Sequence, residues 1–323
     1  MIRDELLTIL WQNVDTTISG EELSRRLSVS RTAIWKAIGQ LRGDGYEIES
    51  VSNRGYRLHS LSDVLCEEGI LRHLRHRELE LRVYKSISST NTVLKALADE
   101  GACAGLVLVA GQQTEGRGRM GRSFYSPADS GLYMSLLLRP VLPAAEAARL
   151  TACAAVAVAK TIEELSGKAA QIKWVNDVLV DGRKVCGILT EASLDCENGM
   201  MRYVVIGSGI NTRIPDGDFP EELRGIAGSA FGEEQIPELR CRLAAGILDR
   251  LMDYAAKPDD PAVFEAYKSR SCLLGQEINI LCPGKEPVPA VAVDLEDDYS
   301  LLVRLSDGSI RNLNYGEVSI RKT

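Results

Sequence analysis

The sequence of 323 residues lacks the motifs that are typical of metal-binding sites and of membrane-spanning segments. It has only three histidines, no Cys-x-x-Cys and no His-Glu-x-x-His, so a zinc site is not expected. Eight cysteines do not indicate a disulfide scaffold in so long a chain, which predicts reduced thiols. No apolar run reaches the length of a membrane span, and residues 1–5 do not begin a signal peptide. These absences predict a cytoplasmic protein without a membrane partner.

The chain is acidic as a whole but carries one basic segment. Its hydrophobic fraction of 45% and charged fraction of 26% are those of soluble globular proteins, and its length allows two or three domains. The net charge of −7 argues against a protein that is coated in nucleic acid. Residues 23–43, however, contain no acidic side chain and five basic ones, Arg25, Arg26, Arg31, Lys36 and Arg42. A basic face on an acidic chain is typical of a DNA-binding module fused to another domain.

Residues 1–62 show the pattern of a winged helix-turn-helix. Ser19 and Glu22 form a capping box that begins one short helix, and Ser30 can cap a second helix. The buried face of the second helix is expected to hold Ile34, Ile38 and Leu41. Residues 46–58 then predict a hairpin of two short strands, which would be the wing.

The exposed surface of this region supplies the candidate DNA contacts. They are Gly20, Ser30, Arg31, Thr32, Trp35, Lys36, Gln40 and Arg54. Two helices joined by a tight turn, with basic and amide groups on the second, have the geometry of a DNA-reading unit. The alternative is a helical cap that packs on the rest of the chain or mediates dimerisation. The absence of acidic residues from the basic segment favours the DNA-binding interpretation, because packing on the rest of the chain does not require a segment free of acidic residues.

A loop rich in glycine and arginine occupies residues 114–124. Its glycines let backbone N–H groups approach an anion, and its arginines supply donor forks that fit carboxylate and phosphate. The alternatives are a flexible surface loop and an arginine-glycine tract that touches RNA. The segment is single and short, and apolar strands at 106–110 and 132–138 frame it, which favours an anion-binding loop. It is not a Walker loop, because no Gly-Lys-Ser or Gly-Lys-Thr closes it.

Four further polar clusters interrupt the apolar strands of the central region. Residues from about 64 to 270 alternate strands with helices, which predicts an α/β layer with a buried helix at 144–165. The clusters occupy 88–91, 173–177, 182–189 and 207–211, and the last is expected to end the strand 203–206. Each cluster alone is typical of a cap or a turn. Together they place hydroxyls, amides, lysines and a carboxylate at strand ends, where the ligand sites of α/β proteins lie.

Taken as a set, these motifs are specific. The Gly-Arg-Gly-Arg-x-Gly-Arg loop at 116–122 is followed by Lys-Trp-x-Asn-Asp at 173–177 and Lys-x-x-Gly-Ile-Leu at 184–189. The whole chain resembles the bifunctional biotin–protein ligase and biotin operon repressor family. The resemblance implies an α+β multidomain chain. Its parts would be a winged helix-turn-helix domain at 1–62, a central α/β ligase domain at 63–272 and a small SH3-like β-barrel at 273–323.

The resemblance also implies an enzyme that works in two steps and regulates transcription. Members of the family join biotin to ATP, which gives biotinyl-5′-adenylate and pyrophosphate, and then transfer biotin to a lysine of a biotin carboxyl carrier protein. The first step brings two anions together, so Mg²⁺ and cationic side chains are expected in the site. The adenylate-bound protein is expected to form a homodimer that binds operator DNA and represses biotin-synthesis genes.

The matched motifs imply a role for each polar cluster. The catalytic residues would be Lys184, Arg119 and Asp177. Lys184 would bridge the biotin carboxylate and the α-phosphate, and Asp177 would either hold Mg²⁺ or orient the carrier lysine. Biotin would contact Ser89, Thr90, Asn91, Gln113, Arg117, Gly118, Arg119 and Lys184. ATP and the adenylate would contact Arg122, Phe124, Lys173, Asn176 and Asn211, with Phe124 stacked on adenine.

The chain departs from the family pattern at a few positions. The family commonly has arginine where this chain has Met120, a Lys-Trp pair where it has Ser123 and Phe124, and proline where it has Val175. These departures are expected to affect how the loop retains the adenylate. The resemblance still implies the same reaction. Two alternatives remain open, a biotin-sensing repressor with weak catalysis and an enzyme of the lipoate ligase type. The winged helix and the C-terminal barrel together favour biotin.

Overall fold

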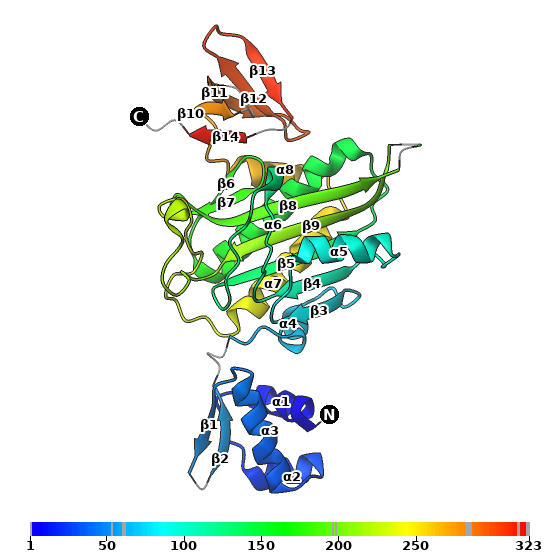
Figure 1. Cartoon of the computed structure of the whole chain (residues 1–323), viewed down its shortest axis with the longest axis vertical. Helices are drawn as coiled ribbons and strands as arrows, with labels where there is room; N and C mark the ends of the chain where they lie inside the picture. The colour runs from blue at the N-terminus through cyan, green and yellow to red at the C-terminus, as the bar shows by residue number, and fades with distance from the viewer. Residues whose placement is uncertain are drawn as a thin grey trace. The chain divides into compact units, whose positions relative to one another are not determined.

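A computed structural model describes residues 2–52, 54–59, 63–195, 197, 199–281, 286–314 and, for the backbone alone, 317–320. The chain forms two compact units, which are described separately (Figure 1). The first unit combines Met1–His73 with Glu234–Arg242, and the second combines Leu74–Glu233 with Leu243–Thr323. Residue 53, in the expected turn of the wing, lies outside the described residues. The domain boundaries expected from the sequence stay predictions.

The first unit contains the expected winged helix-turn-helix. Its elements are α1 (Ile2–Gln12), α2 (Gly20–Leu27), α3 (Arg31–Gly43), β1 (Ile48–Val51), β2 (Gly55–Leu58) and α4 (Glu67–His73). Both serine caps are confirmed, because the hydroxyl of Ser19 accepts from the N–H of Glu22 at 3.1 Å and that of Ser30 from Ala33 at 3.2 Å. The Glu22 side chain forms an ion pair with Arg26. β1 and β2 pair antiparallel and form the predicted hairpin.

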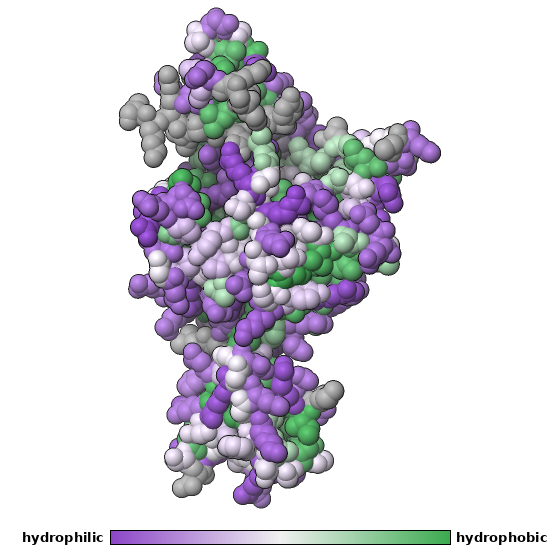
Figure 2. Space-filling view, in the orientation of Figure 1, coloured by the Kyte–Doolittle hydropathy of each residue, from purple (hydrophilic) through white to green (hydrophobic). Residues whose placement is uncertain are grey.

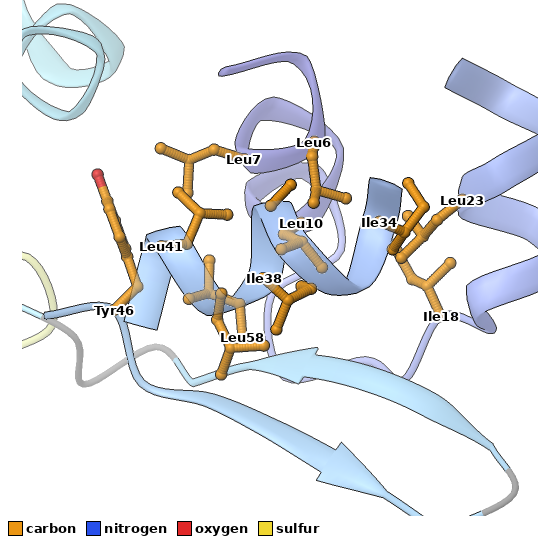
Figure 3. Close-up of a cluster of buried hydrophobic side chains, with 12 residues drawn as sticks. Leu6, Leu7, Leu10, Ile18, Leu23, Ile34, Ile38, Leu41, Tyr46 and Leu58 are labelled. Carbon is orange, nitrogen blue, oxygen red and sulfur yellow. The ribbon is translucent and has the colours of Figure 1, made fainter. Parts of the chain in front are cut away.

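The helices and the hairpin of the first unit enclose one hydrophobic core (Figure 3). Its buried side chains include Leu6, Leu7, Leu10, Ile18, Leu23, Ile34, Ile38, Leu41, Tyr46 and Leu58. The buried positions of α3 recur every three or four residues, which confirms the predicted inner face and leaves the other face to solvent. Full burial of one such aliphatic side chain contributes about 1.5–3 kcal/mol, so the core fixes α3 against the hairpin.

The second unit is built on a seven-stranded sheet in the order β3-β4-β5-β9-β8-β7-β6. Its strands are β3 (Glu80–Tyr84), β4 (Leu106–Ala110), β5 (Gly131–Leu138), β6 (Ala170–Lys173), β7 (Asp177–Val180), β8 (Arg183–Leu194) and β9 (Met201–Asn211). β3 and β4 pair in parallel, and the other neighbouring strands pair antiparallel. The central layer is therefore mostly antiparallel, unlike the sheet of an α/β protein with regularly alternating strands and helices.

Helices cover both faces of this sheet. α5 (Thr90–Asp99) packs on one face, where Leu94 joins a core with Leu137 and Val205. α6 (Ala147–Ser166), the predicted buried helix, packs on the other face, where the hydroxyls of Thr151 and Thr190 are 2.8 Å apart. Thr190 pairs with Ile206, the residue after Val205, and the side chains of successive residues in a strand point to opposite faces of the sheet. Thr190 and Val205 therefore face opposite sides, so α5 and α6 cover different faces. The remaining helical segments are η1 (Arg119–Gly121), η2 (Ala144–Glu146), η3 (Glu221–Leu223), α7 (Leu239–Ala255) and α8 (Pro261–Lys268).

β9 continues through residues 207–211, where the sequence predicts the end of the strand. Both glycines of this segment keep their ladder pairs with β5 and β8. A Cβ at Gly207 would lie 2.0 Å from Asn91 Oδ1, and a Cβ at Gly209 would lie 2.5 Å from the Phe124 ring. The predicted strand end is wrong because these glycines make room for side chains above the sheet rather than forming a turn.

The C-terminal part of the second unit is a small antiparallel β domain. Its strands are β10 (Glu277–Leu281), β11 (Val288–Leu295), β12 (Leu301–Leu305), β13 (Ile310–Leu313) and β14 (Glu317–Ile320), in the order β13-β12-β11-β10-β14. The buried ring of Tyr299 packs edge-on against Tyr267 of α8, with ring centroids 5.2 Å apart. The carbonyl of Tyr299 accepts a hydrogen bond from Trp174 Nε1 at 2.8 Å. These contacts join the β domain to the turn that follows β6.

The visible surface is mainly hydrophilic. On the face in Figure 2, hydrophilic residues predominate and hydrophobic residues form separate patches. Large exposed apolar side chains include Val141, Trp35 and Met120, which come from different segments of the chain. None of the described helices has both the length and the apolar character needed to cross a membrane.

Candidate functional site

A cavity of about 260 Å³ opens beside the Gly/Arg loop of the second unit. It is lined by Arg117, Gly118, Arg119, Arg122, Ser123, Phe124, Lys173, Trp174, Asn176, Asp177, Lys184, Gly187, Ile188, Leu189 and Leu281. The Gly/Arg loop therefore meets the clusters at 173–177 and 182–189, which are far from it in the sequence. Five of the lining residues are cationic and Asp177 alone is acidic, so the wall attracts a polyanion.

Lys184 and Asp177 form an ion pair in the lining of this cavity. β7 and β8 are joined by a tight hairpin with a bulge, which brings the two side chains to the same face of the sheet. Lys184 Nζ lies 2.7 Å from Asp177 Oδ1, and both side chains are partly exposed to solvent. A paired ammonium of this kind is held in place and remains reachable by an anionic ligand. Two of the three predicted catalytic residues are thus brought together.

The Gly/Arg loop is folded back on itself and tied to the turn after β6. The N–H of Gly118 donates to the carbonyl of Arg122 at 2.7 Å, and the N–H of Phe124 donates to Gly116 at 2.8 Å. Arg119 Nη1 donates to Asn176 Oδ1 at 2.9 Å. These hydrogen bonds give the loop a definite course over the cavity, so a set of donors is present before an anion arrives.

A second, smaller cavity of about 20 Å³ adjoins the first and is lined by hydroxyl and amide groups. Its walls include Ser89, Thr90, Asn91 and Gln113, as predicted, together with Arg117, Gly207 and Ser208. Gln113 Oε1 accepts from the Thr90 N–H at 2.9 Å and from its hydroxyl at 3.1 Å. The Ser135 hydroxyl lies 2.6 Å from Asn91 Oδ1 and 2.7 Å from Thr90 Oγ1. The cavity therefore offers donors and acceptors in fixed positions, which suits a ligand with paired N–H and C=O groups.

Glu191 and Lys95 extend this network and do not stand out in the sequence. Glu191 Oε2 accepts from Asn91 Nδ2 at 3.0 Å, and Glu191 Oε1 lies 2.7 Å from Lys95 Nζ and 3.8 Å from Arg117 Nη1. Burial on its own would raise the pKa of the Glu191 carboxyl group, but hydrogen bonds from Lys95 and Asn91 and the charge of Lys95 hold this pKa below its ordinary value. The carboxylate therefore fixes the Asn91 amide and faces the loop arginine. Ser135, the one serine in an apolar strand, was the available signal for this network.

Phe124 lies where the two cavities meet. Its ring lines both cavities, packs over Gly187 and Gly209, and makes an edge contact with Tyr133 at 6.4 Å between centroids. Met120, earlier in the same loop, has a left-handed backbone with φ of 55° and a side chain that is 57% exposed. The ring separates the amide-lined cavity from the cation-lined one, and its stacking on adenine stays a prediction.

Asn211 is placed apart from the other predicted site residues. Its side chain is buried, and its Nδ2 donates to the carbonyl of Gly228 at 3.2 Å. The residue is absent from the described lining of both cavities. Lys173, in contrast, lines the larger cavity together with Asn176. The contact of Asn211 with a nucleotide therefore stays a prediction without support from the geometry.

The first unit presents a second candidate site on α3. Gly20 begins α2, Ser30 caps α3, and Arg54 is exposed in the hairpin turn. The exposed residues of α3 include Arg31, Thr32, Trp35, Lys36 and Gln40, which lie away from the core. Trp35 is 65% exposed, which is unusual for its size and typical of a contact surface.

Two of the basic residues near this surface are already paired within the first unit. Arg31 Nη2 lies 2.7 Å from Glu21 Oε2. Arg42 donates to the carbonyl of Ile48 at 2.8 Å and to the Ser50 hydroxyl at 2.9 Å, so it ties α3 to the wing. The positive charge that is available to a ligand is therefore smaller than the sequence count indicates.

The chain matches three family models in order. They are an HTH domain at residues 3–57, the Biotin/lipoate A/B protein ligase family at 83–211 and the Biotin protein ligase C terminal domain at 273–321. A relative from Bacillus subtilis (strain 168), Bifunctional ligase/repressor BirA, is 42% identical over 238 residues, which cover 72% of this chain and 73% of the relative. The chain belongs to the bifunctional biotin ligase/repressor family. A relative of the same name from Escherichia coli (strain K12) is 35% identical over 306 residues, 94% of this chain and 92% of the relative.

A solved structure agrees with this family. The biotin protein ligase from Aquifex aeolicus in complex with biotin and ATP superposes with a TM-score of 0.60 at 26% identity, and covers 76% of this chain and 99% of that one. As a family member, the chain is a biotin–protein ligase joined to a helix-turn-helix repressor domain. The fold expected from the sequence, a winged helix, a ligase domain and a small β domain, is confirmed.

Replacement of Gly207 by alanine is expected to raise the KM for biotin about tenfold, with a smaller change in kcat. The new Cβ would lie 2.0 Å from Asn91 Oδ1, so it must displace the amide that orders the smaller cavity. Steady-state biotinylation with varied biotin measures the effect. Gly43→Ala is the matched control, because a Cβ at that position would meet no other atom within 4 Å. An unchanged KM for biotin in Gly207→Ala would contradict a role for the Asn91 hydrogen-bond network in biotin binding.

Replacement of Glu191 by glutamine is expected to lower the thermal unfolding midpoint at pH 7. It is also expected to make this midpoint less dependent on pH under acidic conditions. The folded-state pKa of Glu191 is lowered, so its contribution to stability is present above the ordinary pKa of about 4.3 and is lost as the pH falls through the folded pKa. The unfolding midpoint of the parent protein should therefore fall more steeply below about pH 4 than that of Glu191→Gln. The exposed Glu286→Gln serves as the control. Parallel curves for the parent and Glu191→Gln would exclude this role.

Proposed function

We propose that the two adjoining cavities of the second unit bind biotin and ATP side by side and form biotinyl-5′-adenylate. The observation that carries the proposal is the meeting of Lys184, three loop arginines and Asp177 in one cavity beside the amide-lined one. The smaller cavity would hold the ureido ring of biotin through Ser89, Thr90, Asn91 and Gln113. The biotin carboxylate would then reach past Phe124 toward Lys184.

In the first step, a biotin carboxylate oxygen attacks the α-phosphorus of ATP. A new P–O bond forms, the bond between the α-phosphorus and the bridging oxygen breaks, and pyrophosphate leaves with the electron pair. Lys184 would leave Asp177 and bridge the carboxylate and the α-phosphate, which lowers the repulsion between the two anions. Arg117, Arg119 and Arg122 would hold the carboxylate and the phosphates from the loop.

In the second step, the ε-amine of a lysine on a biotin carboxyl carrier protein attacks the acyl carbon of the adenylate. The C–N bond of the amide forms, the C–O bond to AMP breaks, and one amine proton is released. Asp177 would orient the incoming amine, because its carboxylate faces the cavity once Lys184 has turned to the substrate.

Mg²⁺ would enter with the triphosphate rather than as a resident ion. Asp177 is the one carboxylate among the lining residues, and among the described residues no group of three or more His, Cys, Asp and Glu side chains could hold a metal. Magnesium commonly binds through one or two carboxylates together with substrate phosphates and water, so this donor set fits. When bound, the ion would supply charge neutralisation for the triphosphate.

The first unit would read operator DNA of biotin-synthesis genes through α3. Exposed Trp35, Lys36 and Gln40 would enter the major groove, and Arg54 of the wing would contact phosphate. We propose that the adenylate acts as corepressor and that the liganded protein binds as a homodimer in the cytoplasm. Met120 and Ser123 leave the loop with two cations fewer than the family pattern, which favours weaker retention of the adenylate.

A transfer assay tests the proposed enzyme. Full-length protein with biotin, ATP and Mg²⁺ is expected to attach biotin to one lysine of a carrier domain, which a mass increase and streptavidin binding measure. Lipoate replaces biotin in the parallel reaction and is expected to give no label. Label from lipoate alone would instead assign a lipoate ligase, and no label from either would leave a biotin-sensing repressor.

A further inference from the structure

Two cysteine thiols that take no part in the proposed reaction lie together in the first unit. Cys66 precedes α4, and Cys241 belongs to α7, although 175 positions separate them in the chain. A Cβ built at Gly69 would lie 2.6 Å from the Cys241 sulfur and 3.2 Å from the Cys66 sulfur. Both sulfurs therefore lie close to the space that Gly69 leaves empty, and the side chain of a larger residue at position 69 would enter that space.

Hydrogen bonds make the two thiols chemically different. The Cys66 sulfur accepts from the Tyr46 hydroxyl at 3.2 Å and from the Gly69 N–H at 3.3 Å. The Cys241 thiol lies 3.4 Å from the carbonyl of Val64, which can accept its proton. Donors thus converge on one sulfur and an acceptor faces the other, so Cys66 is the better thiolate and Cys241 retains its proton.

The titration behaviour of the pair agrees with this geometry. Hydrogen bonds from the Cys241 thiol, the Tyr46 hydroxyl and the Gly69 N–H lower the pKa of Cys66 to about 7, although its burial opposes the shift. The hydrogen bond with Cys66 and burial raise the pKa of Cys241. Burial also raises the pKa of Cys153, in the second unit, so that thiol stays protonated.

The segments that carry the two thiols are held together by other contacts as well. Asp63, just before Cys66, accepts from the N–H of Arg240 at 2.8 Å and from its Nε at 3.0 Å. Cys66 is partly exposed, whereas Cys241 is buried. An oxidant can therefore reach the first sulfur, and the second is already adjacent to resolve the product.

We propose that Cys66 and Cys241 form a reactive dithiol site that peroxides oxidise to an intramolecular disulfide. The Cys66 thiolate attacks the peroxide, an S–O bond forms, the O–O bond breaks, and the second oxygen leaves as water or an alcohol after taking up a proton. The Cys241 sulfur then attacks the Cys66 sulfenic acid. An S–S bond forms, the S–O bond breaks, and the released hydroxide takes the Cys241 proton as water.

The disulfide would lock the segment that leaves the winged helix onto the start of α7. Tyr46, whose hydroxyl contacts Cys66, is a buried member of the winged-helix core, so the cross-link would stabilise this unit against unfolding. The residues that line the two cavities all belong to the second unit, so biotinylation is expected to remain unchanged.

Oxidation of the full-length protein by hydrogen peroxide at pH 7, followed by alkylation, digestion and mass spectrometry, tests the site. We expect a linked Cys66–Cys241 peptide pair, and Cys66 consumed roughly fivefold faster than the exposed Cys103, because hydrogen-bond donors stabilise the Cys66 thiolate. Cys241→Ser should accumulate a Cys66 sulfenic acid that dimedone traps, and Cys66→Ser should give neither product. Circular dichroism and thermal unfolding of each variant check that the first unit has folded.

Thermal unfolding supplies an independent readout. The oxidised parent protein is expected to unfold at a higher temperature than the reduced one, dithiothreitol should reverse the difference, and Cys66→Ser should show none. Both thiols remaining free after Cys103 has been oxidised would overturn the proposal. A disulfide from either thiol to a different cysteine would overturn it as well.

Discussion

Replacement of Lys184 by alanine is expected to slow biotin-dependent release of pyrophosphate from ATP about 10²–10³-fold. Lys184 is the cation that the β7–β8 hairpin holds 2.7 Å from Asp177, in the cavity that the loop arginines share. Its loss leaves the approaching carboxylate and α-phosphate without a bridging charge, while the partly exposed site leaves the fold intact. Pre-steady-state pyrophosphate release measures the rate, and thermal unfolding checks the fold.

Two further variants separate the role of Lys184 from that of its neighbours. Lys173→Ala removes a second lysine of the same cavity and is expected to slow pyrophosphate release about tenfold, because no ion pair with the described part of the chain fixes its position. Asp177→Asn keeps the Lys184 charge and is expected to slow transfer to the carrier more than adenylate formation. A larger loss in Lys173→Ala than in Lys184→Ala would move the catalytic role to Lys173.

Replacement of Trp35 and Lys36 together by alanine is expected to weaken operator binding about 10²-fold and leave biotinylation unchanged. Both side chains are exposed on the face of α3 opposite the core, so their removal does not disturb packing. Lys36→Ala alone should lower the slope of log K against log salt concentration by about 1, because one phosphate contact is lost. Trp35→Ala alone should reduce discrimination between operator and random DNA.

Fluorescence anisotropy with DNA from upstream of biotin-synthesis genes measures this binding in the presence of biotin and ATP. Arg304→Ala is the control, since it removes one exposed charge from the C-terminal β domain. Equal binding by the double variant and the control would favour a packing or dimerisation role for the winged helix.

Local patterns were sufficient to predict the winged helix-turn-helix of the first unit. The serine caps, the three-to-four-residue recurrence of Ile34, Ile38 and Leu41, and the hairpin all depend on neighbours in the sequence. Arg42 shows the limit of such patterns. It counts as part of a basic face, yet it serves the contact between α3 and β1, which depends on residues folded back onto the helix.

The second unit was predicted less completely, because the conformation at several of its key positions depends on contacts with residues that are distant in the sequence. Gly207 and Gly209 indicate a turn when read alone, but they lie within β9 beneath Asn91 and Phe124. Glu191 follows Thr190 in the polar part of β8 and is typical of a solvent-facing position, although its partner Lys95 lies on α5. Motif resemblance pointed to many of the polar residues that line the two cavities, and the fold supplied the network that holds them.

The central claim is that this chain joins biotin to the α-phosphate of ATP. Its most direct test is pyrophosphate release from full-length protein with ATP and Mg²⁺, with biotin present or absent and no carrier protein. The account predicts release that requires biotin, with one equivalent of pyrophosphate per chain and biotinyl-5′-adenylate recovered from the same sample. Release that lipoate supports and biotin does not, or no release with either acid, would contradict it.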